Sequence, residues 1–334
     1  MKGKRWLGIG VLALLIALGA IWAWRSPALR PDRGPHGELR SGYYTLVDDH
    51  GQTVLATALA VAPGDAFVDE RNRRYVVERV RGRTATVRYT GTIQLQSGLP
   101  AAEVALADAA AGARRAAAAP AGPIAGVASG PATATALPIG GQPKTIVIYH
   151  THDDESYVPT DGRPNIDAGG GVLSVGAALA EMLRVRGFQA VHDTTSHLPH
   201  DANAYIRSRR TVVQDLQRYR PYALYDIHRD TPPPDEYRTT IDGRTVARIM
   251  IVVGRQNPLL QVNRYEAERL KATADALYPG LVLGIFYGQG SYNQDIDAGV
   301  LLIEIGTQFQ PRSEAELAAG YLGNVIVAAF GGGP

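Results

Sequence analysis

Residues 145–157, TIVIYHTHDDESY, place an apolar run directly before a cluster of polar residues. The run 145–149 is almost entirely apolar, which is typical of a strand that is buried on both faces of a sheet. The histidines and carboxylates that follow then lie at the end of that strand, where parallel sheets bind their ligands. This stretch therefore predicts both the type of fold and the position of a functional site.

Strands and helices alternate from residue 144 to residue 330. Helical spacing of apolar residues predicts helices near residues 175–187, 204–220, 260–277 and 314–329. Short apolar runs predict further strands at residues 188–191, 222–227, 249–253, 282–286 and 300–305. We therefore expect an α/β domain over residues 144–330, with a mostly parallel, twisted sheet flanked by helices.

The N-terminus predicts a membrane anchor. Residues 6–24 carry no charge, and these nineteen residues span about 28 Å as a helix, close to the apolar thickness of a bilayer. Residues 1–25 are therefore expected to form a cytoplasmic tip and a single transmembrane anchor, with the remaining domains outside the cell membrane. A cleaved signal peptide is the alternative, although residues 20–25 make a poor cleavage site.

Three segments separate the anchor from the α/β domain. Residues 26–40 are rich in Pro and Arg and are expected to be a tether. Short alternating runs over residues 41–92 predict a small β-rich module of about five strands, for which a spacer or interaction role is expected. Residues 93–143 are rich in Ala, Pro and Gly and are typical of a linker.

Composition limits the chemistry. The chain has no cysteine, so any metal must be held by His, Asp or Glu. Its 34 basic residues nearly balance its 32 acidic residues, and the net charge of +2 gives no indication of nucleic-acid binding. A hydrophobic content of 45% is sufficient for a sizeable core.

Polar clusters lie at the ends of three predicted strands, in residues 149–157, residues 226–230 and at Glu304. Burying a carboxylate without a partner is costly, so Glu304 is expected to meet a cation, a hydrogen-bond donor or a metal-bound water. Two histidines and one carboxylate that leave an open position are the usual catalytic zinc set. The sequence therefore favours zinc over calcium or magnesium, which need more oxygen ligands.

Other interpretations of the same residues stay open. His150 and His152 are two residues apart and could be surface histidines, and His228 could be a hydrogen-bonded core residue. Glu304 could be an ion-pair partner of Arg229.

Four motifs in combination resemble those of the stage II sporulation protein P family. They are His150-Thr151-His152-x-x-Glu155-Ser156-Tyr157, Asp226-Ile227-His228-Arg229-Asp230, Tyr292-Asn293-Gln294-Asp295 and Leu302-Ile303-Glu304-Ile305-Gly306. The resemblance covers about residues 140–330 and implies a fold similar to that of zinc-dependent N-acetylmuramoyl-L-alanine amidases. It implies a membrane-anchored peptidoglycan hydrolase of endospore formers that cuts the bond between muramic acid and the stem peptide, and some members of the family are credited with endopeptidase cleavage of cross-links. The resemblance further implies that the protein works during engulfment, beside a lytic transglycosylase, the stage II sporulation protein D.

The resemblance also implies a set of zinc ligands. His152 matches the first ligand better than His150, which is either a supporting residue or the alternative ligand. His228 is the second histidine ligand. Glu155 is the expected carboxylate ligand and Asp167 the reserve, because the related amidases carry a later Glu that this chain lacks.

Roles in the reaction follow from the same resemblance. Glu304 matches the family's catalytic glutamate and is expected to be the general base, with Arg229 stabilising the oxyanion. Asp230, Asn293 and Gln294 are expected to contact the peptidoglycan substrate.

Three further histidines, His192, His197 and His200, are weaker metal candidates. For His197 and His200, a solvated turn before a helix is the favoured interpretation. A non-catalytic cell-wall-binding scaffold is the chief rival function, and a metal-dependent endopeptidase that acts on cross-links alone is the second.

Overall fold

A computed structural model describes residues 39, 42–95, 144–201 and 203–330. The predicted anchor at residues 1–25 and nearly all of the tether and linker lie outside the described residues. Within the described ranges, no helix has the length and apolar character needed to cross a membrane.

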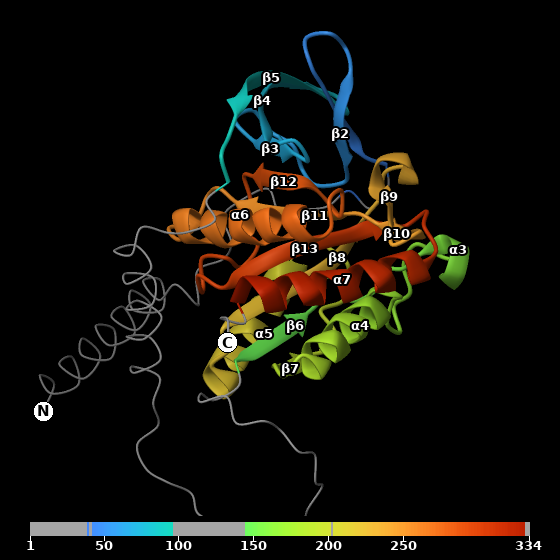
Figure 1. The fold of residues 1–334 in the computed structure, drawn as a ribbon, viewed down its shortest axis with the longest axis vertical. Coiled ribbons are helices and arrows are strands. Elements are labelled where there is room, and N and C mark those ends of the chain that lie inside the picture. Colours follow the sequence, from blue (N-terminus) through green and yellow to red (C-terminus); the bar gives the residue numbers. More distant parts are fainter. Residues whose placement is uncertain (1–38, 40–41, 96–143, 202, 331–334) are drawn as a thin grey trace, which may run out of the picture.

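A mixed sheet of eleven strands runs through the molecule in the order β2-β1-β5-β4-β3-β12-β11-β13-β8-β6-β7 (Figure 1). Its N-terminal strands are β1 Tyr44–Val47, β2 Thr53–Thr57, β3 Ala66–Asp69, β4 Arg73–Arg81 and β5 Thr84–Thr92. Its C-terminal strands are β6 Thr145–Tyr149, β7 Gln189–His192, β8 Ala223–Asp230, β11 Ile249–Gly254, β12 Val282–Gly288 and β13 Val300–Thr307. Neighbouring C-terminal strands pair in parallel, except that β11 and β13 pair with each other in antiparallel fashion. This part of the sheet is therefore mostly parallel, as expected.

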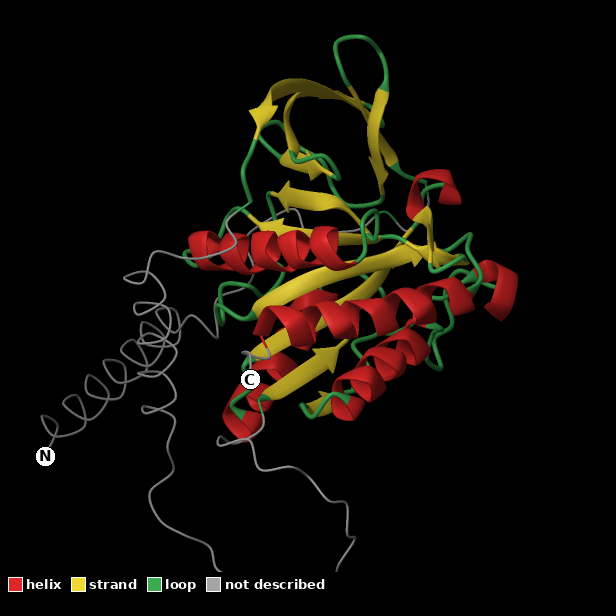
Figure 2. Cartoon of the chain, viewed as in Figure 1, coloured by secondary structure: helices red, strands yellow, loops and turns green. Residues whose placement is uncertain are grey.

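Helices cover both faces of the C-terminal strands (Figure 2). The helices are α3 Val158–Asp161, α4 Val172–Val185, α5 Ala204–Tyr219, α6 Leu260–Leu277 and α7 Arg312–Phe330. Aliphatic residues of the sheet pack with α4, α6 and α7 in one large core, and α5 lies against the opposite face. Each of the four predicted long helices is present, with ends within three residues of those expected.

A short hairpin was not predicted. Strands β9 Arg238–Ile241 and β10 Arg244–Ala247 follow the 3-10 helix η2 Pro234–Tyr237 and pair with each other in antiparallel fashion. Asp242 and Gly243 form the two-residue loop with φ of 51° and 73°. Both residues need positive φ in such a loop, so the Asp-Gly pair was the available sequence signal.

The five predicted N-terminal strands are present, but they extend the main sheet. Strand β3 pairs in antiparallel fashion with β12, from Ala66 opposite Tyr287 to Asp69 opposite Gly284. A Cβ at Gly284 would lie 2.3 Å from the backbone oxygen of Val68, so glycine permits this close pairing. The expected β-rich module is therefore structurally continuous with the C-terminal strands, and the boundary near residue 92 falls at the end of β5.

Candidate active site

Strand β8 carries three polar side chains to one face of the sheet. Because side chains alternate along a strand, Asp226, His228 and Asp230 point away from the aliphatic core, whereas Tyr225 and Ile227 pack into it. All five side chains are buried. The polar face of β8 therefore holds titratable groups that are removed from solvent.

Glu304 lies directly beside His228. The two residues are register partners in the parallel pair β13 and β8, so their side chains share a face. The register shifts between Glu304 and Thr307, where Gly306 has a φ of +67°. A Cβ at Gly306 would lie 2.7 Å from Oε1 of Gln310, so this irregularity requires glycine. Such bulges often re-aim a side chain next to an active site.

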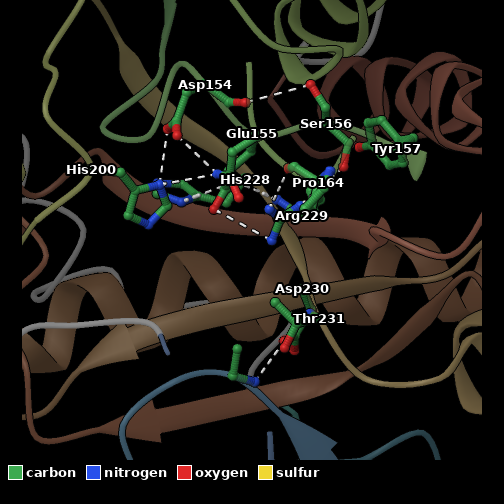
Figure 3. Close-up of polar contacts among 12 residues, drawn as sticks. Asp154, Glu155, Ser156, Tyr157, Pro164, His200, His228, Arg229, Asp230 and Thr231 are labelled. Atoms are coloured by element: carbon green, nitrogen blue, oxygen red, sulfur yellow. Dashed lines mark hydrogen bonds and ion pairs between the residues drawn. The ribbon is translucent and has the colours of Figure 1, made fainter. Parts of the chain in front are cut away.

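The loop after β6 brings His152 and Glu155 to His228. Figure 3 shows Glu155 beside His228. The rings of His152 and His228 are 5.3 Å apart and nearly perpendicular. Glu155 Oε2 lies 3.6 Å from Nδ1 of His228. The structure therefore gathers the three side chains that were predicted as zinc ligands.

Protonation states at this cluster suit a metal ion. Burial, with His200 and His228 as neighbours, lowers the pKa of His152 well below its usual value, so the imidazole is neutral. Burial alone raises the pKa of Glu155, but Arg229 and His228 lower it well below its usual value, so the carboxylate is charged. Within the described residues, the buried Nδ1 of His152 has no hydrogen-bond partner. Neutral imidazole and carboxylate groups are the zinc-binding forms, so these residues fit zinc.

His200 joins this cluster from a distant loop. Its ring stacks on His152 with centroids 3.8 Å apart, and its Nδ1 lies 2.9 Å from Oδ1 of Asp154. Ligand atoms of His152, Asp154 and His200 all lie within 4.8 Å of one another. The structure therefore offers two overlapping sets of metal donors, and both contain His152.

A cavity of about 570 Å³ opens beside His200, and Asp154, Asn165, Asp167, Leu198 and Pro199 also line it. The reserve ligand Asp167 thus lies at this cavity and not in the cluster of buried donors. His197 is buried, with Nδ1 2.7 Å from the backbone oxygen of His150 and Nε2 2.8 Å from Thr211. The expected solvated turn is therefore wrong for His197, because its ring bridges two elements of the core.

His150 serves the packing of the core. Its Nδ1 is 2.9 Å from the backbone oxygen of Ile227, and its Nε2 is 2.9 Å from Nε2 of His192. Burial, with His192 next to it, lowers the pKa of His150 to about 3. Both ring nitrogens of His150 therefore contact other protein atoms.

Arg229 holds the loop that carries Glu155. Its backbone N–H donates to Glu155 Oε2 at 2.9 Å, and its guanidinium donates to the backbone oxygens of Ser156 and Pro164. Arg229 directly follows His228 on β8, so the two side chains point to opposite faces of the sheet. This arrangement orients a predicted ligand and differs from the oxyanion contact that the sequence led us to expect.

Three expected substrate contacts lie in buried networks. Asn293 donates to Ser208 at 2.9 Å, and Gln294 holds the end of β11 through Gly254 N–H and the backbone oxygen of Val252. Asp230 accepts hydrogen bonds from the backbone N–H of Ala58, which directly follows β2, and from the hydroxyl of Tyr237. Because Asp230, Asn293 and Gln294 are all buried, the structure does not place them on an accessible surface.

Sequence comparison identifies related proteins. The family model of Stage II sporulation protein P matches residues 114–327. Stage II sporulation protein P of Bacillus subtilis (strain 168) is 32% identical over 204 residues, which are 56% of this chain and 51% of that protein. The chain therefore spans about half the length of this curated relative.

Several solved amidase structures have some likeness to this chain. N-acetylmuramoyl-L-alanine amidase AmiC2 of Nostoc punctiforme aligns with a TM-score of 0.37 and 16% identity, over 57% of this chain and 98% of the amidase. The CwlD amidase from Clostridioides difficile, solved in complex with the GerS lipoprotein, aligns with a TM-score of 0.36 and 13% identity. That alignment covers 56% of this chain and 98% of CwlD.

Proposed function

This chain belongs to the stage II sporulation protein P family, and from that premise we propose that it is a zinc-dependent peptidoglycan hydrolase of sporulation. The specific activity that we propose is that of an N-acetylmuramoyl-L-alanine amidase. The observation that carries the proposal is the buried pairing of Glu304 with His228, beside His152 and Glu155. A carboxylate next to a cluster of metal donors is the arrangement that amide hydrolysis requires.

We propose His152, Glu155 and His228 as the residues that would hold zinc. When bound, zinc would supply a Lewis acid and a water of lowered pKa. Asp226 supports His228, because its Oδ1 lies 2.9 Å from Nε2 of the ring. Asp226 is itself held by the backbone N–H and hydroxyl of Thr151. Hydrogen-bonded carboxylates of this kind fix the orientation of a histidine ligand.

Glu304 would act as general base and general acid. Its carboxylate would accept a proton from the attacking water and then deliver that proton to the departing L-alanine nitrogen. Arg229 would hold Glu155 in its charged, metal-binding form, through the backbone hydrogen bond and through a guanidinium that lies 3.8 Å from Glu155 Oε1. In this proposal separate residues of the chain bind the metal, orient its ligands and transfer the proton.

Muropeptide analysis tests this function. Purified peptidoglycan would be incubated with the full chain, with and without a chelator, and the products identified by mass spectrometry. Free stem peptides that disappear with the chelator and return with zinc are the expected result. Split cross-links without free stem peptides would instead show an endopeptidase, and unchanged peptidoglycan would show a cell-wall-binding protein and overturn the proposal.

Attachment to the membrane belongs to the same proposal. We infer that residues 1–25 anchor the chain with its enzymatic part outside the membrane, beside a stage II sporulation protein D-type lytic transglycosylase. Fractionation of cells is expected to recover the full chain with membranes and a chain that lacks residues 1–25 in the soluble fraction. Recovery of both in the soluble fraction would exclude the anchor.

A further inference from the structure

We propose that residues 42–93 are part of the catalytic unit, and that Asp230 is the positioning residue through which they act on the active site. The family model begins at residue 114 and does not include these strands. The inference rests on the proposed function, because it concerns the same site. It replaces the expected role of a spacer with a direct contribution to catalysis.

Asp230 joins the N-terminal strands to the strand of His228. Its Oδ1 accepts hydrogen bonds from the backbone N–H of Ala58 at 2.6 Å and of Thr231 at 2.7 Å. Its Oδ2 accepts from the hydroxyl of Tyr237 at 2.6 Å. Thr231 donates to the backbone oxygen of Gly42 at 2.7 Å. Figure 3 shows Asp230 and Thr231 at the end of the strand that carries His228. Hydrogen bonds to a buried carboxylate are strong, so these contacts fix the N-terminal strands at the active site.

Tyr237 connects Asp230 to the neighbourhood of Glu304. The Tyr237 hydroxyl lies 3.8 Å from Sδ of Met250, and Met250 is the register partner of Glu304 across β11 and β13. Burial, and then the charges of Asp230 and Glu304, raise the pKa of Tyr237 well above its usual value. The phenol therefore stays protonated and can donate to Asp230 throughout the physiological pH range.

The N-terminal strands also supply apolar surface on the same face. One buried cluster combines Leu59, Val61 and Phe67 of the N-terminal part with Tyr237, Met250 and Leu302 of the C-terminal part. Leu302 precedes Glu304 by two residues on β13 and shares its face. Removal of the N-terminal strands would therefore open the apolar wall beside the proposed general base to water.

A second contact across the same junction provides a matched control. Arg255 Nε lies 2.7 Å from Oδ1 of Asp65, a buried carboxylate of the N-terminal part. Arg255 follows Met250 by five residues, which is about 16 Å along an extended strand. This ion pair therefore holds the two parts together without contacting the neighbourhood of Glu304.

The test compares Asp230→Ala and Tyr237→Phe with Arg255→Gln in the full chain. Turnover and KM would be measured on purified peptidoglycan, and amide hydrogen exchange would be followed at Ala58. We expect the first two variants to lower kcat at least about 10-fold with KM within about threefold, because small displacements at an active site have effects of this size. Arg255→Gln is expected to keep kcat within about threefold. Exchange at Ala58 should accelerate in Asp230→Ala and not in Arg255→Gln.

Asp230→Asn is expected to recover part of the lost kcat, because its carbonyl oxygen still accepts from Ala58. If Asp230→Ala does not fold, Tyr237→Phe decides, since it removes a single oxygen. A folded Tyr237→Phe with kcat within about twofold of the parent overturns the inference. A parallel loss of kcat in Arg255→Gln also overturns it, because the strands would then serve general stability. If the parent protein releases no product from peptidoglycan, the proposed function itself is wrong.

Discussion

The two faces of the C-terminal sheet differ although the same strands build them. Towards α4, α6 and α7 the strands present aliphatic residues such as Ile227 and Ile303. Towards α5 and the N-terminal strands they present His228 and Glu304, one residue further along each strand. The first face is stabilised mainly by apolar burial, whereas the second requires a partner for each charged group. Because side chains alternate along each strand, the residues that form the apolar core and the residues of the candidate active site lie on opposite faces of the same sheet.

The largest effect is expected from Glu304→Gln, which changes the polar face alone. Loss of the general base should lower turnover about 100-fold to 10,000-fold while zinc stays bound, because Glu304 is not a proposed ligand. Release of stem peptides and zinc content would be measured on the same preparation. Turnover close to that of the parent would contradict the assignment of Glu304.

Zinc binding would show which donor set on this face holds the ion. We expect His228→Ala to weaken zinc binding by more than about 100-fold, whereas His200→Ala should cost about 10-fold, as is usual for an outer partner. Competition with a chelating dye measures both affinities. A larger loss in His200→Ala would assign the ion to His152, Asp154 and His200.

The packing of His150 and His192 against α4 is tested by Gly176→Ala. A Cβ at Gly176 would lie 2.6 Å from Nε2 of His150 and 2.8 Å from Nε2 of His192. We expect a decrease of about 1–3 kcal/mol in the free energy of unfolding, as is typical of overpacking. Urea denaturation measures it. In the control Gly320→Ala on α7, the nearest contact is Met182 at 3.9 Å, and alanine should stabilise that helix by up to about 1 kcal/mol. Equal effects of both changes would contradict the close packing at His150.

The smallest effect is expected at Asp215, a buried residue of α5 that has no role in the proposed reaction. Burial, and then the charge of Asp193, raise the pKa of Asp215 on α5 to about 7. Folding thus favours the protonated form, so the contribution of Asp215 to stability is present below about pH 4 and is lost as the pH rises towards 7.

Asp215→Asn should therefore be more stable than the parent at pH 8, by about 1 kcal/mol, and should gain little at pH 4. Urea denaturation at both pH values measures the difference, with Glu181→Gln on the exposed side of α4 as the control. A gain that is larger at pH 4 than at pH 8 would show that the pKa of Asp215 is not raised.

Sequence predicted the regular part of this molecule because local periodicity determines it. The strand at residues 145–149 and the helix that begins at residue 204 have the predicted starts, since apolar spacing sets them. The meeting of His152, Glu155 and His228 was also expected, because the carboxyl ends of parallel strands share one edge. His200 and Asp230 were misjudged, because their partners Asp154 and Ala58 lie 46 and 172 residues away. No local pattern reports contacts of that kind.

The pairing of β3 with β12 has a practical consequence for work on this protein. A chain that starts after residue 93 would leave the backbone N–H and C=O groups of residues 284–287 without their strand partner. An exposed row of such groups recruits strands from other molecules, which leads to self-association. Aggregation of an N-terminally shortened chain would then result from the missing strand partner and not from an intrinsic insolubility of the C-terminal part.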